Sequence, residues 1–192
     1  LGRLAACFLD SAASCEIPLD GYGIRYKYGL FRQSFAADGS QTEAPDDWQK
    51  IKDAFAIKRE DESVTVEYAD YSVKAIPYDY NIIGYSFKRI NTLRLYECRK
   101  DTCSDAEAEK LYEYLYPDDS TDEGKKLRLR QQYFLVSAAL QNIVNKYGLD
   151  AYEYQCGNGV KTRWQASGKT EMNVCGVIRH LEFVQEQHLL LF

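Results

Sequence analysis

The side chains of this sequence with the greatest capacity for chemistry are its six cysteines and two histidines. No two cysteines form a Cys-x-x-Cys pair, and with only His180 and His188 available no spacing typical of a zinc site occurs. An even number of cysteines is compatible with disulfides in a secreted chain, but the sequence shows no signal peptide and no apolar run long enough to span a bilayer. We therefore expect no metal site, reduced thiols and a cytoplasmic location.

The composition limits the partners that the chain can have. Its 192 residues are 45% hydrophobic and 28% charged, which is typical of a globular domain with a real core. The net charge of −5 and the lack of a basic block argue against nucleic acid or an anionic membrane as the main partner. The sixteen tyrosines suit sugar contacts or the amphipathic edge of a core, because each presents a flat apolar ring and a hydroxyl, and we favour the core edge.

The first thirty residues predict a helix, a turn and a strand. Apolar residues recur at helical spacing from Leu1 to Ala12 and form one apolar stripe. Pro18 and Gly21 interrupt this helix. From Gly23 to Leu30, small or apolar residues alternate with tyrosine, arginine and lysine, which favours a strand. The order of these elements indicates part of an α/β layer.

The middle of the chain predicts strands. The predicted strands are Ser63–Tyr68, Tyr71–Ile76, Ile82–Tyr85 and Ile90–Cys98. The first two form a hairpin, and Pro77 is expected to end the second. Arg94 stands between Leu93 and Leu95, so its side chain should point to the opposite face of the sheet. From the residues alone, that side chain either lies in solvent or serves a site.

Two capping boxes predict where helices begin in the second half of the chain. Ser104 and Glu107 mark the start of a short helix, and Ser120 with Glu123 marks the start of a long one that Gly148 ends. Residues of the long helix at spacings of three and four predict one buried stripe, which consists of Leu129, Tyr133, Val136, Leu140, Ile143 and Tyr147.

Several phrases, in the same order, resemble the glycogen and α-glucan phosphorylases. They are LGRLAACFLDS (1–11), GYGIRYKYGLF (21–31), PDDW (45–48), AIPYD (75–79), NTLRLY (91–96) and LYPDDSTDEGKKLRLRQQYFLVSAALQ (115–141). The resemblance covers residues 1–148 and matches an internal piece of the N-terminal half of much longer enzymes. It implies an α/β fold, namely a truncated N-terminal domain of a two-domain, Rossmann-like glycosyltransferase of the GT-B type.

The resemblance also implies an activity. Such enzymes use phosphate to cleave α-1,4-glucan, glycogen or maltodextrin, to α-D-glucose 1-phosphate, and they depend on pyridoxal 5'-phosphate held by a lysine. That lysine and the residues that hold the substrate phosphate belong to the C-terminal half, and no residue here matches them. We therefore expect no catalytic and no cofactor-binding residue in this chain, and no activity from the chain alone.

Two places are implied to face the substrate. The backbone at Leu1 and Gly2 corresponds to the glucosyl site, where a helix N-terminus offers free N–H groups; core packing is the simpler role of Leu1. Asp119 and Ser120 correspond to a mobile gate loop that shields the catalytic site, and plain capping of the following helix is the simpler role for this turn.

The resemblance also implies residues that serve regulation and subunit assembly. Arg94 corresponds to a cation of an effector phosphate site. In animal enzymes a pair of arginines binds a nucleotide phosphate, and the corresponding residues here are Asn145 and Lys146. Because neither residue offers the bidentate guanidinium, we expect little activation by AMP. Cys7 corresponds to a cysteine linked to subunit association, with packing as its default role. The connection from Cys98 to Glu113 is much shorter than in most of the family, so the family's homodimer is doubtful for this chain.

From Leu149 the resemblance ends. Residues 149–192 are a divergent tail, in which Val174–Leu191 fits an amphipathic helix. Three hypotheses stand for the whole chain: a segment of an α-glucan phosphorylase, a non-catalytic remnant of one with at most glucan-binding ability, and a related glycosyltransferase such as a glycogen synthase. The third is the weakest, because the phrases are phosphorylase-like throughout. The first two differ only in what lies outside this chain.

Overall fold

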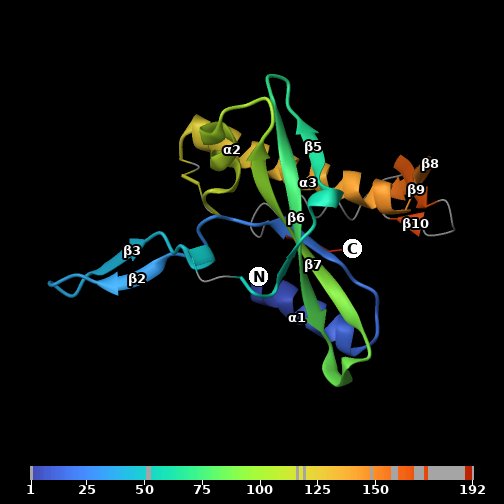
Figure 1. The fold of residues 1–192 in the computed structure, drawn as a ribbon, viewed down its shortest axis with the longest axis horizontal. Coiled ribbons are helices and arrows are strands. Elements are labelled where there is room, and N and C mark those ends of the chain that lie inside the picture. Colours follow the sequence, from blue (N-terminus) through green and yellow to red (C-terminus); the bar gives the residue numbers. More distant parts are fainter. Residues whose placement is uncertain are drawn as a thin grey trace.

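The computed structural model describes residues 2–50, 53–115, 117–118, 120–147, 149–156, 160–166, 171–172 and 189–191. Its centre is a long antiparallel strand pair, β6 (Ser72–Ile83) and β7 (Ile90–Lys100), as Figure 1 shows. These two strands form the middle of the main sheet, whose order is β11-β1-β7-β6-β4, with β5 also paired to β6.

The neighbours of the central pair make the sheet a mixed one. Strand β1 (Gly21–Ile24) runs parallel to β7, and β11 (Leu189–Leu191) runs antiparallel to β1. On the other side, β5 (Val64–Glu67) and β4 (Ala56–Lys58) pair antiparallel with successive parts of β6. The predicted hairpin of two strands around residues 69–70 is confirmed.

Strand β6 continues through Pro77, so the prediction that this proline ends the strand is wrong. Pro77 lies opposite Tyr96 of β7, and its carbonyl accepts a hydrogen bond from the backbone N–H of Arg59 at 2.9 Å. Because the nitrogen and carbonyl of one strand residue point to the same side, the missing N–H of Pro77 faces the gap between β5 and β4. The sheet therefore loses no hydrogen bond there.

The core lies between the sheet and two helices, α2 (Asp105–Tyr112) and α3 (Asp122–Tyr147). Strand side chains of the sheet face inward against α3, with Tyr22 and Tyr96 stacked at a ring distance of 6.5 Å. The completely buried side chains include Val66, Val73, Tyr96, Leu111, Phe134 and Leu135.

Helix α1 (Gly2–Ser14) lies on the other face of the sheet. Strand side chains alternate between faces, so Leu93 points away from the core residue Tyr96 and lines a hollow with α1. After β6, a Cβ on Gly84 would lie 2.3 Å from the carbonyl carbon of Ala13. This close approach of the turn to α1 requires a glycine.

The apolar stripe predicted for α1 is only partly buried. Leu9, Ala12 and Ala13 are buried, whereas Leu4 and Phe8 are about half exposed. The N-terminal residue Leu1 lies outside the described residues.

The starts of the two later helices were predicted to within one residue. Ser104 and Glu107 form the expected capping box at α2. For α3 the capping side chain is Thr121 rather than Ser120, because Thr121 Oγ1 accepts the backbone N–H of Gly124 at 3.1 Å. The helix therefore begins one residue later than predicted.

The predicted buried stripe of α3 is confirmed at Ile143, which is buried, and at Val136, which packs against the core, but it is wrong at Leu129 and Tyr133. Leu129 is 71% exposed and Tyr133 is half exposed. The buried residues are Phe134, Leu135, Ala138, Ala139 and Ile143, together with Gln131, Gln132 and Asn142. A polar side chain is tolerated in this face where it is hydrogen-bonded; Asn142, for example, donates to the carbonyl of Glu62 at 2.9 Å.

A two-stranded arm projects from the body of the molecule (Figure 1). It consists of β2 (Arg32–Phe35) and β3 (Gln41–Ala44), whose residues are all exposed. At the turn of the arm, Gly39 has a φ of +82°, a conformation that suits glycine, and Asp38 accepts from the N–H of Ser40.

The rest of the described chain adds short elements. Three 3-10 turns are η1 (Trp48–Lys50), η2 (Glu60–Glu62) and η3 (Tyr85–Phe87). A separate antiparallel sheet consists of β8 (Leu149–Cys156), β9 (Val160–Ala166) and β10 (Glu171–Met172). The helix predicted over 174–191 is wrong at its end, since 189–191 form β11; the remainder lies outside the described residues. No helix among the described residues has the length and apolarity to cross a membrane.

Candidate functional site

A polar pocket of about 450 Å³ opens between the sheet and the C-terminal end of α3. Its lining comes from β1, β6, β7, η2 and α3, and consists of Asp20, Tyr22, Arg59, Asp61, Glu62, Ser63, Asp79, Thr92, Arg94, Asn142, Asn145 and Lys146. We refer to it below as the Arg94 pocket. The parallel pairing of β1 with β7 and the antiparallel pairing of β6 with β7 bring these distant segments together.

Arg94 is held in this pocket by two carboxylates. It lies directly opposite Asp79 across the β6–β7 ladder, and the two side chains form a bidentate pair with N–O distances of 2.7 and 2.8 Å. A third bond joins Arg94 Nη1 to Glu62 at 2.6 Å. Burial alone would lower the pKa of Arg94, but its hydrogen bonds to Asp79 and Glu62 outweigh burial and raise that pKa. The guanidinium therefore stays charged, and its hydrogen bonds go to these two carboxylates.

The pocket as a whole carries more acid than base. Its lining contains three cationic side chains, those of Arg59, Arg94 and Lys146, against four carboxylates. Arg59 also bonds to Asp79, at 3.3 Å, and Lys146 lies 3.9 Å from Asp20. An anion that entered would have to compete with these carboxylates for each cation.

Asn142 fixes α3 to the wall of the pocket. Its Oδ1 accepts from the Tyr96 hydroxyl at 2.7 Å and its Nδ2 donates to the carbonyl of Glu62 at 2.9 Å. A single amide therefore joins the helix to β7 and to η2, and the pocket geometry depends on it.

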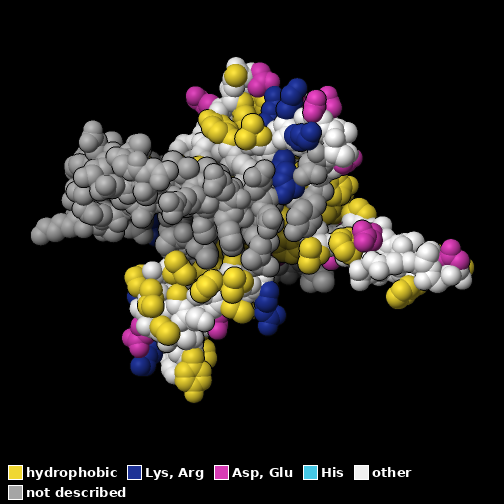
Figure 2. All heavy atoms as spheres, turned by 180° about the vertical axis from the view of Figure 1, so that it is seen from behind, with side chains coloured by type: hydrophobic (Ala, Val, Ile, Leu, Met, Phe, Trp, Pro, Cys, Tyr) yellow, Lys and Arg dark blue, Asp and Glu magenta, His cyan; other side chains and the backbone are white. Residues whose placement is uncertain are grey.

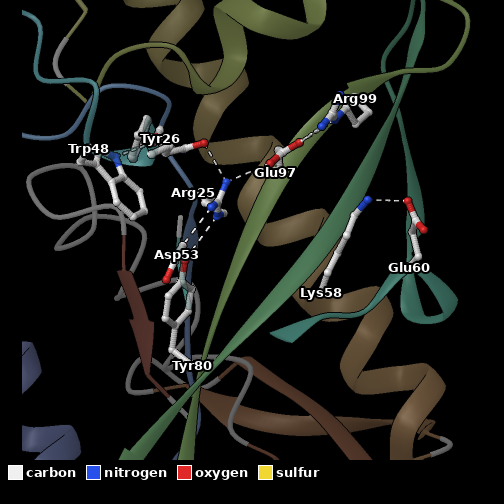
Figure 3. A network of polar contacts seen from close by, with 10 residues as sticks. Arg25, Tyr26, Trp48, Asp53, Lys58, Glu60, Tyr80, Glu97 and Arg99 are labelled. Atoms are coloured by element: carbon white, nitrogen blue, oxygen red, sulfur yellow. Dashed lines mark hydrogen bonds and ion pairs between the residues drawn. The ribbon is translucent and has the colours of Figure 1, made fainter. Parts of the chain in front are cut away.

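A second arginine, Arg25, lies on the opposite face of the sheet and is surrounded by protein (Figure 3). Its guanidinium donates to Gln49 at 2.8 Å, to Glu97 at 3.0 Å and to the Tyr80 hydroxyl at 3.3 Å, and it lies 3.6 Å from Asp53. We refer to these residues as the Arg25 cluster.

Aromatic rings complete the Arg25 cluster. The guanidinium carbon lies 4.4 Å from the ring centre of Tyr78 and 5.4 Å from that of Trp48. Trp48 donates its ring N–H to the carbonyl of Tyr26 at 3.0 Å, which fixes the ring beside Arg25. Burial, together with the hydrogen bond from Tyr80 to Asp53, raises the pKa of Tyr80 to about 12. Arg25 itself is buried and lines none of three pockets among the described residues, so we interpret the cluster as a structural contact that stabilises the fold.

Comparison with known proteins identifies the family of this chain. A family model described as "Carbohydrate phosphorylase" matches residues 1–156, which is beyond the end of the resemblance at Gly148. This chain belongs to the carbohydrate phosphorylase family.

Individual phosphorylases agree with this assignment. The chain is 44% identical over 173 residues to the glycogen phosphorylase of Bacillus subtilis, covering 77% of this chain and 22% of that protein. It is 38% identical over 179 residues to the potato (Solanum tuberosum) α-1,4 glucan phosphorylase L-1 isozyme, and 35% identical over 196 residues to the liver glycogen phosphorylase of Bos taurus. These matches cover 77% and 86% of this chain but 18% and 23% of the relatives. The chain thus spans about a fifth of their length.

The structure brings together one set of residues that the phosphorylase resemblance singled out. Arg94, Asn145 and Lys146 all line the Arg94 pocket. Sequence reasoning missed Asp79 and Glu62, because their role depends on strand register. No signal in the sequence pointed to Asp79, because the predicted strand ended before it, whereas β6 continues beyond it and pairs with β7.

The other predicted site residues are spread over the molecule. Gly2 begins α1, and Leu1 and Asp119 lie outside the described residues. Ser120 donates its N–H to Asp118 at 3.0 Å, which makes a local turn. Cys7 is exposed, so the alternative that it is a buried packing residue is wrong. The cysteines at 7, 15, 98 and 103 are free thiols, and the described residues contain no cluster suited to a metal ion.

The lysines with well-defined partners do not suit pyridoxal phosphate, the cofactor that the resemblance implies. Lys27, Lys58 and Lys100 are hydrogen-bonded to Glu109, Glu60 and Asp105 respectively. These hydrogen bonds raise the pKa of each amine. A Schiff base forms from a neutral amine, usually one whose pKa is lowered. These lysines therefore do not fit the cofactor.

Proposed function

We propose that this chain is a segment of an α-glucan phosphorylase, which converts α-1,4-glucan and phosphate to α-D-glucose 1-phosphate with pyridoxal phosphate. The observation that carries this proposal is the family match over residues 1–156, together with 44% identity to a glycogen phosphorylase. In this proposal the chain is part of the N-terminal domain of a GT-B enzyme that acts in the cytoplasm, with residues 1–148 as the phosphorylase segment and 149–192 as a divergent tail.

The chain alone is inactive in this proposal. Phosphorolysis needs a cofactor phosphate, a substrate phosphate and cations that offset their repulsion. Lys27, Lys58 and Lys100 do not suit the cofactor, and the cations of the Arg94 pocket are paired with carboxylates. The alternative is a remnant of such an enzyme that at most binds glucan.

Two parts of the segment would face the substrate in the complete enzyme. The N-terminal end of α1, at Leu1 and Gly2, would contribute backbone N–H groups to the glucosyl site. The turn at Asp119 and Ser120 would act as the gate loop; the local bond from Ser120 to Asp118 supports a tight turn there.

The Arg94 pocket would correspond to the effector site of regulated phosphorylases, with its phosphate affinity lost. Lys146 and Asn145 lack the planar guanidinium group that binds phosphate through two hydrogen bonds. Arg94 is already paired with Asp79 and Glu62. A longer enzyme that contains this chain should therefore show little activation by AMP. Assays with and without AMP test this, and a several-fold rise in activity would contradict it.

The family's homodimer is not expected of this chain. The match to the Bacillus subtilis enzyme is 173 residues long although it covers 77% of 192 residues, so the relative carries residues that this chain lacks. This supports a shortened connection at Cys98–Glu113 and the loss of one contact patch. Cys7 is exposed and available for a subunit contact. Light scattering should show no discrete dimer; a dimer whose proportion is stable on dilution would contradict this.

Activity is tested directly on the purified chain. The chain is incubated with pyridoxal phosphate, freed of excess, and assayed with glycogen and phosphate. We expect no bound chromophore and no glucose 1-phosphate, with the Bacillus subtilis enzyme as the positive control. Phosphate-dependent release of glucose 1-phosphate would overturn the proposal that the chain alone is inactive.

A further inference from the structure

Two cysteines lie at the junction of β7 and α2. Cys98 is near the end of β7, and Cys103 lies in the short bend before α2 begins at Asp105. Both are free thiols; Cys98 is buried and Cys103 is partly exposed. Neither residue lines the Arg94 pocket, and the proposed function gives them no role.

The register of the strands directs Cys98 into the core. It lies opposite Ala75 in the β6–β7 ladder, and both residues are almost completely buried. They belong to the core cluster that also contains Ala108 and Leu111 of α2. The side chain of Cys98 therefore lies on the face of the sheet that α2 and α3 cover.

The chain then bends over this same face. Thr102 donates its N–H to the carbonyl of Ser72 at 3.2 Å, and Ser72 donates its N–H to Thr102 Oγ1 at 2.7 Å. Ser104 caps the start of α2. Cys103 lies between these two fixed points and packs against the core cluster that contains Cys98.

Electrostatic effects also place the two thiols close together. Burial raises the pKa of the Cys98 thiol, and the neighbouring Cys103 adds to this rise. Burial likewise raises the pKa of Tyr71, and both cysteines add to that rise. Because such effects weaken with distance, the two thiols share one region beside Tyr71. The closure that a disulfide needs is confined to the bend between β7 and α2.

The two thiols differ in their access to an oxidant. Cys103 is partly exposed, at the end of the molecule where acidic and basic side chains lie close together on the surface (top of Figure 2). One such pair, Lys100 with Asp105, has an N–O distance of 2.8 Å. Cys98 is buried, and its raised pKa makes it the less reactive thiol, because the thiolate is the form that attacks. An oxidant therefore meets Cys103 first.

We propose that Cys98 and Cys103 form a disulfide in response to a peroxide, and that this bond is reversed by a thiol reductant. The sulfur of Cys103 attacks one oxygen of hydrogen peroxide, the O–O bond breaks, and a sulfenic acid and one water result. The Cys98 sulfur then attacks the Cys103 sulfur, loses its proton and displaces the second water. Two thiols thus lose two electrons and two protons, and one peroxide becomes two waters.

The disulfide would connect the end of β7 to the start of α2. Disulfides in reducing compartments are typically transient ones of this kind, which sense the redox state. The inference is independent of the proposed phosphorylase function, because it uses neither the glucosyl site nor the Arg94 pocket.

Peptide mapping of the full chain tests the proposal. The reduced chain is freed of reductant, treated with hydrogen peroxide, blocked with iodoacetamide and digested with trypsin. Trypsin cuts after Arg99 and Lys100, between the two cysteines, so a disulfide keeps peptides 95–99 and 101–110 joined. We expect this linked pair to appear with peroxide and to separate with dithiothreitol.

Two variants serve as a test and a control. Cys103→Ser should abolish the linked pair and leave Cys98 as a thiol. Cys7→Ser, at an exposed cysteine of α1, should leave the linked pair unchanged. Thermal unfolding of both variants should match the parent within a few degrees, because neither side chain is fully buried.

Three outcomes would overturn the proposal. Cys103 is oxidised to a sulfinic acid without the linked pair; Cys103 joins a cysteine other than Cys98; or peroxide leaves both cysteines as thiols. None of these outcomes affects the proposed phosphorylase function. Failure of that function has a different readout, namely the release of glucose 1-phosphate by the chain alone.

Discussion

Arg25 and Arg94 lie on opposite faces of one sheet, and both are paired with two carboxylates. Their side chains are almost equally buried, at 8% and 11% exposure. The difference is in what surrounds the pairs. Arg25 has aromatic rings and hydrogen-bond partners around it, whereas Arg94 lies beside a pocket of about 450 Å³. The burial of an arginine therefore does not show whether it only stabilises the fold or also belongs to a binding site. The presence of an adjacent polar cavity distinguishes the two cases.

The largest effect is expected from Arg25→Met. The change leaves Asp53 without its cation and leaves Glu97 with only the exposed Arg99, at a place that no pocket of the described residues opens to water, which costs about 3–5 kcal/mol of unfolding free energy. Urea denaturation measures the loss. Arg99→Met is the matched control, since Arg99 pairs with the same Glu97 at 2.5 Å but is exposed, and it should cost about 1 kcal/mol or less. Equal losses from both changes would contradict the role of Arg25 as a structural contact.

Arg94→Met should cost less, about 2 kcal/mol, which is below the range for a fully unpaired buried charge. Asp79 keeps its bond to Arg59, and the open pocket lets water reach both Asp79 and Glu62. The same urea titration applies. A loss as large as that of Arg25→Met would mean that Arg94 is equally structural, and the comparison between the two arginines would fail.

Tyr80→Phe should have the smallest effect, about 1 kcal/mol at neutral pH, because it removes the hydrogen bonds of one hydroxyl. The pKa of Tyr80 is raised to about 12 in the folded protein, above its ordinary value of 10. The folded state thus retains a proton that the unfolded state loses. The contribution of Tyr80 is complete below pH 10 and is lost as the pH rises toward 12.

Urea denaturation at a series of alkaline pH values tests whether the stabilisation by Tyr80 falls as the pH rises. The gap in stability between the parent and Tyr80→Phe should narrow between pH 10 and 12. A gap that widens with pH would contradict the assignment.

Local signals were enough to predict much of the fold. Three features depend on neighbours within a few residues: the Ser104–Glu107 capping box, the hairpin around 69–70 and the long helix α3. Features that depend on tertiary contacts were not predictable. Pro77 stays inside β6 because the adjacent strands leave a gap there. The buried face of α3 contains Leu135 and Ala138, whereas the predicted Leu129 and Tyr133 are exposed.

The site was predictable only in part. The phosphorylase resemblance singled out Arg94, Asn145 and Lys146, and these residues do line one pocket. The carboxylates that neutralise the pocket depend on the register that sets Asp79 opposite Arg94, and no spacing in the sequence encodes that register.

The cations of the Arg94 pocket are already neutralised by the carboxylates of the same pocket. Titration of AMP into the purified chain at low salt tests this neutralisation most directly. We predict no saturable binding up to ~1 mM, where a complex would gain ~4 kcal/mol. Saturable binding in the micromolar range, lost in Arg94→Met, would contradict the claim and would show that the pocket still accepts a phosphate.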